Sequence, residues 1–114
     1  MGKLTTHVLD TSHGRPGAGM RVRLFDADGV LLVDTRTNDD GRCDAPLLQG
    51  ATLKAGRYRL EFSVGDYFRT LIPSLPEPAF LDVVPIAFGV ADPEGHYHVP
   101  LLVSPFGFSS YRGS

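Results

Sequence analysis

Apolar and polar residues alternate along several short stretches of this chain. In residues 57–64, every second side chain is apolar: Tyr58, Leu60, Phe62 and Val64. In residues 20–26, apolar side chains alternate with arginines in the same way. A strand with this period of two has one face in a core and the other toward solvent, as is common in antiparallel sheets. The pattern therefore predicts half-buried antiparallel strands.

Turn residues and shorter apolar runs predict the remaining elements. Asp28-Gly29 predicts a hairpin that leads into a strand over residues 30–33. We expect further strands over residues 4–10, 80–88, 97–103 and 106–112, which makes seven or eight in all. Residues 65–71 predict one or two helical turns, since the prolines that follow prevent a longer helix. Thirteen glycines and nine prolines separate these segments, and this rhythm predicts an all-β sandwich.

Two of the predicted strands carry polar side chains on the face turned away from the core. In residues 96–103, one row is apolar throughout, and the other row contains His96, His98, Pro100 and Leu102. In residues 4–10, the second row contains Thr5, His7 and Leu9. These rows are too apolar for open water and too polar for a core. We expect them to line a cleft or an interface between subunits.

Composition and charge narrow the class of protein. The chain has 114 residues, 42% of them hydrophobic, which predicts one globular domain spanning residues 1–114. The chain has 11 Lys and Arg and 13 Asp and Glu, which gives a net charge of −2. No overall electrostatic field therefore favours nucleic acid or membrane as a partner. The chain lacks the apolar run of a signal peptide or a membrane span. A lone Cys43 excludes an intrachain disulfide, and we expect a cytoplasmic protein in which Cys43 is structural.

Histidine is the most informative candidate for chemistry. His7 and His98 suit acid–base work, because imidazole titrates near neutrality. Taken alone, each is more often a surface or interface histidine with one hydrogen bond, and the further polar groups of Arg42, Tyr111, Arg112 and Ser114, which no core requires, favour chemistry. Arg42 follows a turn and is either a solvated cation or an anchor for substrate oxygens. His96 and His98 share a face but lack further ligands at a recognised spacing, so we expect no metal. His13, in a glycine-containing loop, is expected to be solvated.

Three segments identify the chain with a known family. The sequences THVLDTSHGRPG, NDDGR and HYHVPLLVSPFGFSSYRGS resemble the 5-hydroxyisourate hydrolases, which are related to transthyretin, and the similarity covers essentially the whole chain. The resemblance implies a transthyretin-like sandwich of two four-stranded sheets with a short helix near residues 66–71. It also implies a homotetramer, a dimer of dimers, with active sites between subunits in a central channel.

The resemblance further implies a reaction and its residues. The reaction is hydrolysis of 5-hydroxyisourate, a small-molecule product of urate oxidation in purine catabolism, to 2-oxo-4-hydroxy-4-carboxy-5-ureidoimidazoline, without metal or cofactor. The implied catalytic residues are His7, Arg42, His98 and Ser114. Of these, His98, together with His7, would activate water, and Arg42 would stabilise developing charge. Substrate would be bound by His7, Arg42, Tyr111, Arg112 and Ser114.

Two other interpretations remain open from the sequence. A transthyretin-like carrier would use the channel to bind a small hydrophobic ligand, with the histidines as hydrogen-bond partners only. A structural β-sandwich domain would explain the strands but not the final residues Tyr-Arg-Gly-Ser, which on general grounds would fray and which the resemblance predicts to be ordered. One departure from the family pattern is Pro85, which confines its strand to an edge or a bulge.

Overall fold

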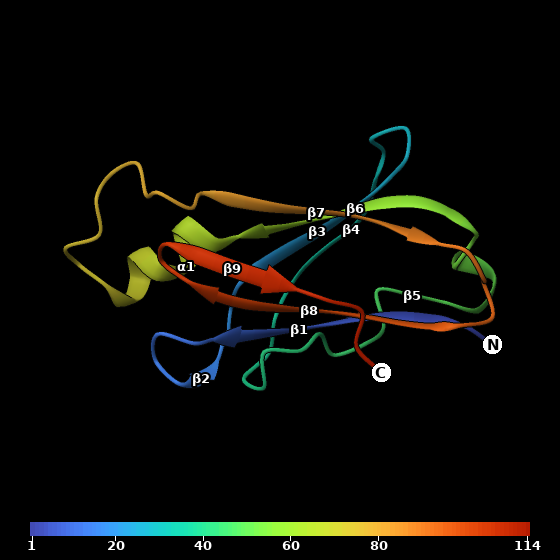
Figure 1. The fold of residues 1–114 in the computed structure, drawn as a ribbon, viewed down its shortest axis with the longest axis horizontal. Coiled ribbons are helices and arrows are strands. Elements are labelled where there is room, and N and C mark those ends of the chain that lie inside the picture. The colour runs from blue at the N-terminus through green and yellow to red at the C-terminus, as the bar shows by residue number, and fades with distance from the viewer.

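The computed structural model describes all 114 residues and folds them into two packed β-sheets (Figure 1). One sheet has the order β2-β1-β8-β9, with β5 paired to the start of β1; its strands are β1 (Lys3–Asp10), β2 (Arg15–Pro16), β5 (Leu48–Gln49), β8 (His96–Ser104) and β9 (Gly107–Ser110). The other has the order β4-β3-β6-β7; its strands are β3 (Arg21–Asp26), β4 (Leu31–Arg36), β6 (Gly56–Ser63) and β7 (Val83–Val90). The predicted all-β sandwich is confirmed.

Two helical segments follow strands. A single turn of 3-10 helix, η1 (Gly50–Thr52), follows β5, and α1 (Val64–Leu71) continues directly from β6. The predicted helix over residues 65–71 is confirmed with one more residue at its start. Tyr67 and Phe68 of α1 are buried, so the helix closes one end of the sandwich, as Figure 1 shows.

Three strands differ from the predicted ones by two or more residues at one or both ends. The hairpin strand β4 begins at Leu31 and runs three residues beyond the predicted end, because it pairs with β3 as far as Arg21. β7 is shifted toward Val90, where it pairs with Gly56 at the start of β6. β9 ends at Ser110, and the tail beyond it makes only one isolated bridge, between Gly113 and His98. The hydrophobic alternation within a strand does not indicate where its pairing with a neighbouring strand ends.

The core lies between the two sheets and consists of twenty buried apolar side chains. Leu4 and Val8 of β1, Leu24 of β3, Leu60 of β6 and Leu101 of β8 are fully buried. Each such side chain contributes about 1.5–3 kcal/mol when it leaves water. These residues are the apolar rows that the alternation predicts, so their neighbours in sequence point away from the core.

One strand pair in the structure is parallel. β1 runs parallel to β8 over its whole length, whereas every other neighbouring pair is antiparallel. Thr5 pairs with His98 and His7 with Pro100 in this register. Strands β1 and β8, far apart in the sequence, therefore lie side by side in the middle of one sheet (Figure 1).

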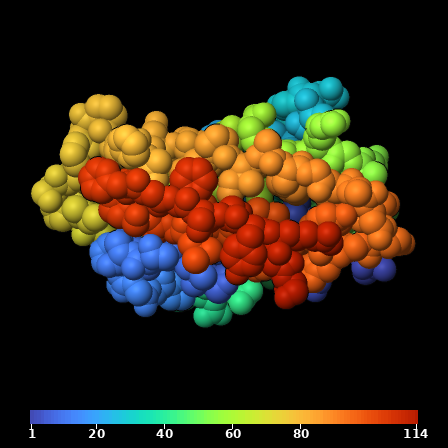
Figure 2. Space-filling view, viewed as in Figure 1, coloured from blue at the N-terminus to red at the C-terminus, as the bar shows by residue number.

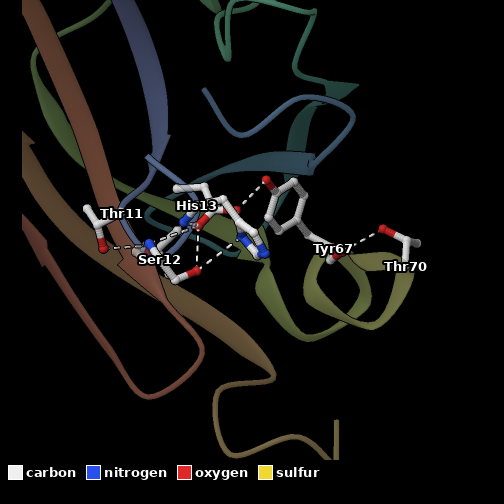
Figure 3. A network of polar contacts seen from close by, with 7 residues as sticks. Thr11, Ser12, His13, Tyr67 and Thr70 are labelled. Atoms are coloured by element: carbon white, nitrogen blue, oxygen red, sulfur yellow. Dashed lines mark hydrogen bonds and ion pairs between the residues drawn. The ribbon is translucent and has the colours of Figure 1, made fainter. Parts of the chain in front are cut away.

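Asp10 holds the end of β1 to α1. Its carboxylate is buried and accepts hydrogen bonds from the Ser12 backbone and hydroxyl, from His13 and from the Tyr67 hydroxyl, which is 2.8 Å away. Figure 3 shows His13 between Ser12 and Tyr67 in this network. His13 also stacks on Phe68. His13 is exposed, as expected of a solvated loop residue, and in addition its Nδ1 lies 2.6 Å from the Asp10 carboxylate.

The edge strands β7 and β9, one from each sheet, lie on the same side of the molecule. β7 and β9 are each the last strand of their sheet, and Figure 2 shows the red C-terminal segment running along the orange part of this surface. β7 is an edge strand, as Pro85 predicts, and Pro85 is exposed. Large apolar side chains are exposed in these two strands or within three residues of them in the sequence: Phe80, Val83, Phe106, Phe108 and Tyr111. The single helix of eight residues is far too short to cross a membrane.

Candidate active site

The second faces of β1 and β8 form one continuous polar surface. Leu4, Thr6 and Val8 are buried, whereas Thr5 and His7 between them are only half-buried. On β8, His98 is half-buried and His96 exposed. Both histidines of the predicted chemistry, His7 and His98, therefore lie outside the core, as the alternation predicts. Pro100 departs from its row and is buried, because it lies between His7 of β1 and Ser110 of β9.

His98 is held by one side-chain hydrogen bond. Its Nδ1 lies 2.8 Å from the Thr5 hydroxyl. Burial lowers the pKa of His98, and the positive charges of Arg42 and of His7 and His96 lower it further. A lowered pKa keeps the imidazole neutral at physiological pH, so that it can accept a proton.

The turn between Asn38 and Arg42 brings a cation to this surface. The Gly41 carbonyl accepts a 2.7 Å hydrogen bond from the Val8 backbone, and Arg42 forms an isolated bridge with His7. Gly41 has φ +77°, and a Cβ there would lie 2.3 Å from the Val8 carbonyl oxygen. Only glycine fits both constraints, so Gly41 fixes the place of Arg42.

His7 is anchored to the same turn. Its Nε2 lies 2.9 Å from the Asp40 carbonyl oxygen. A carbonyl only accepts, so Nε2 must carry the proton and donate it. Nδ1 is therefore the ring nitrogen of His7 that is left for another partner, and the position of the ring beside Arg42 is set by the backbone of the turn.

The C-terminal tail is ordered along β8. Arg112 donates to the His96 carbonyl at 3.2 Å and lies over the Tyr97 ring, 4.0 Å from its centroid. The Gly113 backbone donates to the His98 carbonyl at 2.7 Å. A Cβ on Gly113 would lie 2.6 Å from the Cδ2 of His98, so a glycine lets the tail pass the ring. Ser114 follows at the end of this path.

These elements enclose a pocket of about 320 Å³ on the outer face of the sheet. It is lined by Lys3, Thr5, Thr6, Arg42, Cys43, Asp44, Ala45, Pro46, His96, His98 and Ser114. Three of the sequence-predicted site residues, Arg42, His98 and Ser114, thus meet in one pocket. His7 lies next to it on β1.

The other two predicted residues do not line this pocket. Tyr111 and Arg112 instead line a neighbouring apolar groove of about 240 Å³, together with Ile86 and Phe88. Tyr111 is 60% exposed there. The tail therefore contributes its last residue to the pocket, and Arg112 attaches the tail to β8.

Sequence reasoning did not single out Thr5 or Asp44 in this pocket. The signal for Thr5 is its position two residues before His7, on the same row. No sequence signal relates Asp44 to the histidines, because their approach depends on how the turn docks. Burial raises the pKa of Cys43, and Asp44 raises it further, so Cys43 is a thiol rather than a reactive thiolate. No group of three or more His, Cys, Asp or Glu side chains is arranged to hold a metal ion.

The arrangement suits acid–base hydrolysis of a small polar molecule. A neutral imidazole can take a proton from water, and a guanidinium beside it can stabilise an oxyanion. The hydroxyls of Thr5 and Ser114 supply further hydrogen-bonding groups. Most of the residues that line the pocket are polar or charged, so it suits a polar ligand better than an apolar one.

Comparisons with known proteins agree with this chemistry. The family model "HIUase/Transthyretin family" matches residues 4–113. The 5-hydroxyisourate hydrolase of Ralstonia nicotianae is 59% identical over the full length of both chains. Among solved structures, the 5-hydroxyisourate hydrolase of Klebsiella pneumoniae is 35% identical, with a TM-score of 0.83 and 100% of each chain covered. Transthyretin from Sparus aurata is 25% identical, with a TM-score of 0.85 over 97% of this chain and 96% of that one.

Proposed function

This chain belongs to the HIUase/transthyretin family, and on that premise we propose that it hydrolyses 5-hydroxyisourate in the pocket between β1, β8 and the tail. One observation carries the proposal: His98, whose pKa is lowered by burial and by neighbouring positive charge, shares this pocket with Arg42 and Ser114. The name and the 59% identity of the Ralstonia nicotianae relative support the choice of substrate.

In the proposed reaction, His98 acts as the general base. Its Nε2 takes a proton from water, and the resulting hydroxide forms a bond to a ring carbonyl carbon. The carbonyl oxygen becomes an oxyanion, which the Arg42 guanidinium stabilises. When the oxyanion collapses, the C–N bond breaks and the ring nitrogen takes up a proton from the His98 imidazolium, which restores the neutral base.

The other residues orient the reactants. Ser114 offers a hydroxyl at the pocket for water or substrate. His7 lies beside Arg42 through the backbone of the turn, and we propose that its Nδ1 accepts a hydrogen bond from an N–H or O–H of the substrate or assists proton transfer. Tyr111 and Arg112 act through the tail, because Arg112 is bonded to β8 and thereby fixes Ser114.

We further propose a homotetramer, a dimer of dimers, that works in the cytoplasm. Support for assembly comes from the apolar side chains exposed along the edges of β7 and β9, among them Val83 and Phe108, since such patches mark interfaces. The unpaired Cys43 fits a reducing compartment.

A carrier of apolar ligands is not favoured by the pocket. Such a site gains nothing from charged and ionisable groups, whose burial under a ligand costs free energy unless each is paired. Arg42 and Asp44 both line the pocket, together with His98. These groups suit a polar substrate that changes its charge during reaction.

The decay of freshly generated 5-hydroxyisourate, followed by ultraviolet absorbance, tests the proposal. We expect the protein to accelerate decay well above the spontaneous rate. His98→Asn should lower kcat about 100- to 10,000-fold, the range that a general base supplies, while the fold is kept. The matched control His13→Asn lies outside the pocket and should retain kcat. Decay at the spontaneous rate with wild-type protein would rule out the enzyme.

A further inference from the structure

Thr5 joins the two histidines of β8. Its hydroxyl oxygen lies 2.8 Å from Nδ1 of His98 and 3.1 Å from Nε2 of His96. Thr5 is the residue paired with His98 in the parallel register of β1 and β8, so the contact is set by the sheet. No other side chain makes a hydrogen bond to His98.

A hydroxyl has a single proton, and this limits the arrangement. Thr5 can donate to one of the two rings only, and from the other ring it must accept. If Thr5 donates to His98, the His98 proton sits on Nε2. If Thr5 donates to His96, it must accept a proton from Nδ1 of His98, and Nε2 of His98 is then free.

Only the second arrangement gives a base. Nδ1 of His98 is occupied by Thr5, so Nε2 is the ring nitrogen available to water. Nε2 accepts a proton only when the neutral ring carries its own proton on Nδ1. The resulting imidazolium keeps the same hydrogen bond to Thr5, because Nδ1 remains a donor throughout.

We propose that Thr5 and His96 are positioning residues that hold His98 in its Nδ1-protonated form. The chain of donors runs from Nδ1 of His98 to the Thr5 hydroxyl, and from that hydroxyl to Nε2 of His96. The His96 ring is at the exposed edge of the pocket, where water can satisfy its other nitrogen. Neither residue touches the reacting atoms. The proposal rests on the proposed function, in which His98 is the base.

Thr5→Val tests the relay, since valine keeps the shape of threonine and lacks the hydroxyl. We expect kcat to fall at least about tenfold, as part of the contribution of a general base, with KM unchanged within about twofold. Thr5→Ser should recover most of kcat. The control Thr11→Val replaces a hydroxyl at the far end of β1, where it bonds only to the Val103 carbonyl, and should retain kcat.

A pH profile separates positioning from mere packing. The Thr5 hydroxyl accepts from the His98 imidazolium, so its loss should move the acid limb of kcat/KM to lower pH in Thr5→Val and not in Thr5→Ser. An unchanged acid limb together with unchanged kcat in Thr5→Val would overturn the proposal.

Substitutions at His96 test the proposal independently. His96→Gln retains an oxygen that can accept from Thr5, whereas His96→Phe retains only a ring. We expect His96→Phe to lower kcat as Thr5→Val does, and His96→Gln to restore most of it. Equal kcat values in wild type and His96→Phe would exclude His96 from the relay.

The tautomer itself can be read without any assay of activity. In ¹⁵N-labelled wild-type protein above the His98 pKa, spectra of the ring nitrogens should identify Nδ1 of His98 as the protonated one, and Thr5→Val should increase the Nε2-protonated form. Protonation at Nε2 in the wild type would overturn this inference while leaving the hydrolase intact. Failure of the hydrolysis assay with the Nδ1 form present would instead count against the proposed function.

Discussion

Asp10 illustrates how one buried charge can be stabilised by its neighbours. Burial raises the pKa of its carboxyl, but the hydrogen bonds from Ser12, Tyr67 and His13 outweigh burial and leave the pKa below its usual value. Bonds of this kind to a charged group contribute about 1.5–3 kcal/mol each. Burial and the hydrogen bond to Asp10 together raise the pKa of Tyr67 to about 12.

Tyr67→Phe should therefore destabilise the protein by about 1.5–3 kcal/mol at pH 7, measured by urea unfolding. A lowered carboxyl pKa stabilises the fold above the unfolded value of 3.8, and this stabilisation is lost as pH falls through the folded pKa. The difference between wild type and Tyr67→Phe should thus shrink below about pH 4.

Tyr58→Phe provides the matched control for this measurement. Tyr58 is as buried as Tyr67, at 7% exposure, but its hydroxyl donates to the Lys54 carbonyl, which is neutral. Its loss should cost about 0.5–1.5 kcal/mol and should not depend on pH in the acid range. A Tyr67→Phe effect equally independent of pH would contradict the role assigned to Asp10.

Among elements, the short turn from Asn38 to Arg42 has the largest influence on the pocket. It has no regular structure of its own, and it is held by the Val8–Gly41 hydrogen bond and by the Asn38 side chain, which accepts from the Asp40 and Arg42 backbones. The guanidinium of Arg42 reaches the pocket only because this turn docks on β1.

Gly41→Ala should displace this turn. Alanine at φ +77° costs about 1–2 kcal/mol of backbone strain, and its Cβ would clash with the Val8 carbonyl. Gly29→Ala has the same strain at φ +80° in a turn with free space around it. We expect kcat/KM for 5-hydroxyisourate to fall at least about tenfold in Gly41→Ala and to stay near wild type in Gly29→Ala. Equal kcat/KM values would show that the turn does not position Arg42.

The sequence predicts features that depend on neighbouring residues better than contacts between residues far apart in the chain. Alternation predicted β3 and β6 well, because each apolar row is a local pattern, and it correctly separated His7 and His98 from the core. It missed the Asp10 network, whose partner Tyr67 is 57 positions away. It also could not pair Thr5 with His98, since a register between distant strands leaves no trace in either strand.

For the whole molecule, the exposed edges of β7 and β9 bear on assembly. In light scattering after gel filtration, we expect a mass of four chains of 12.4 kDa, about 50 kDa. Phe108→Lys introduces a charge on this edge, at a side chain 47% exposed, and should lower the mass. Leu31→Lys, at 48% exposure on the opposite edge strand β4, should leave it unchanged. A wild-type monomer at micromolar concentration would refute the tetramer.

The parallel pairing of β1 with β8 also determines when the pocket exists. Thr5 and His98 are 93 positions apart, and closing a flexible loop of that length costs about 4 kcal/mol of chain entropy. The β3–β4 hairpin closes a far shorter loop, so it has the advantage in the order of folding. During synthesis β1 leaves the ribosome long before β8, so the histidines cannot meet until β8 has been made. The pocket therefore forms late in the folding of each newly made chain, and the chain cannot be active before then.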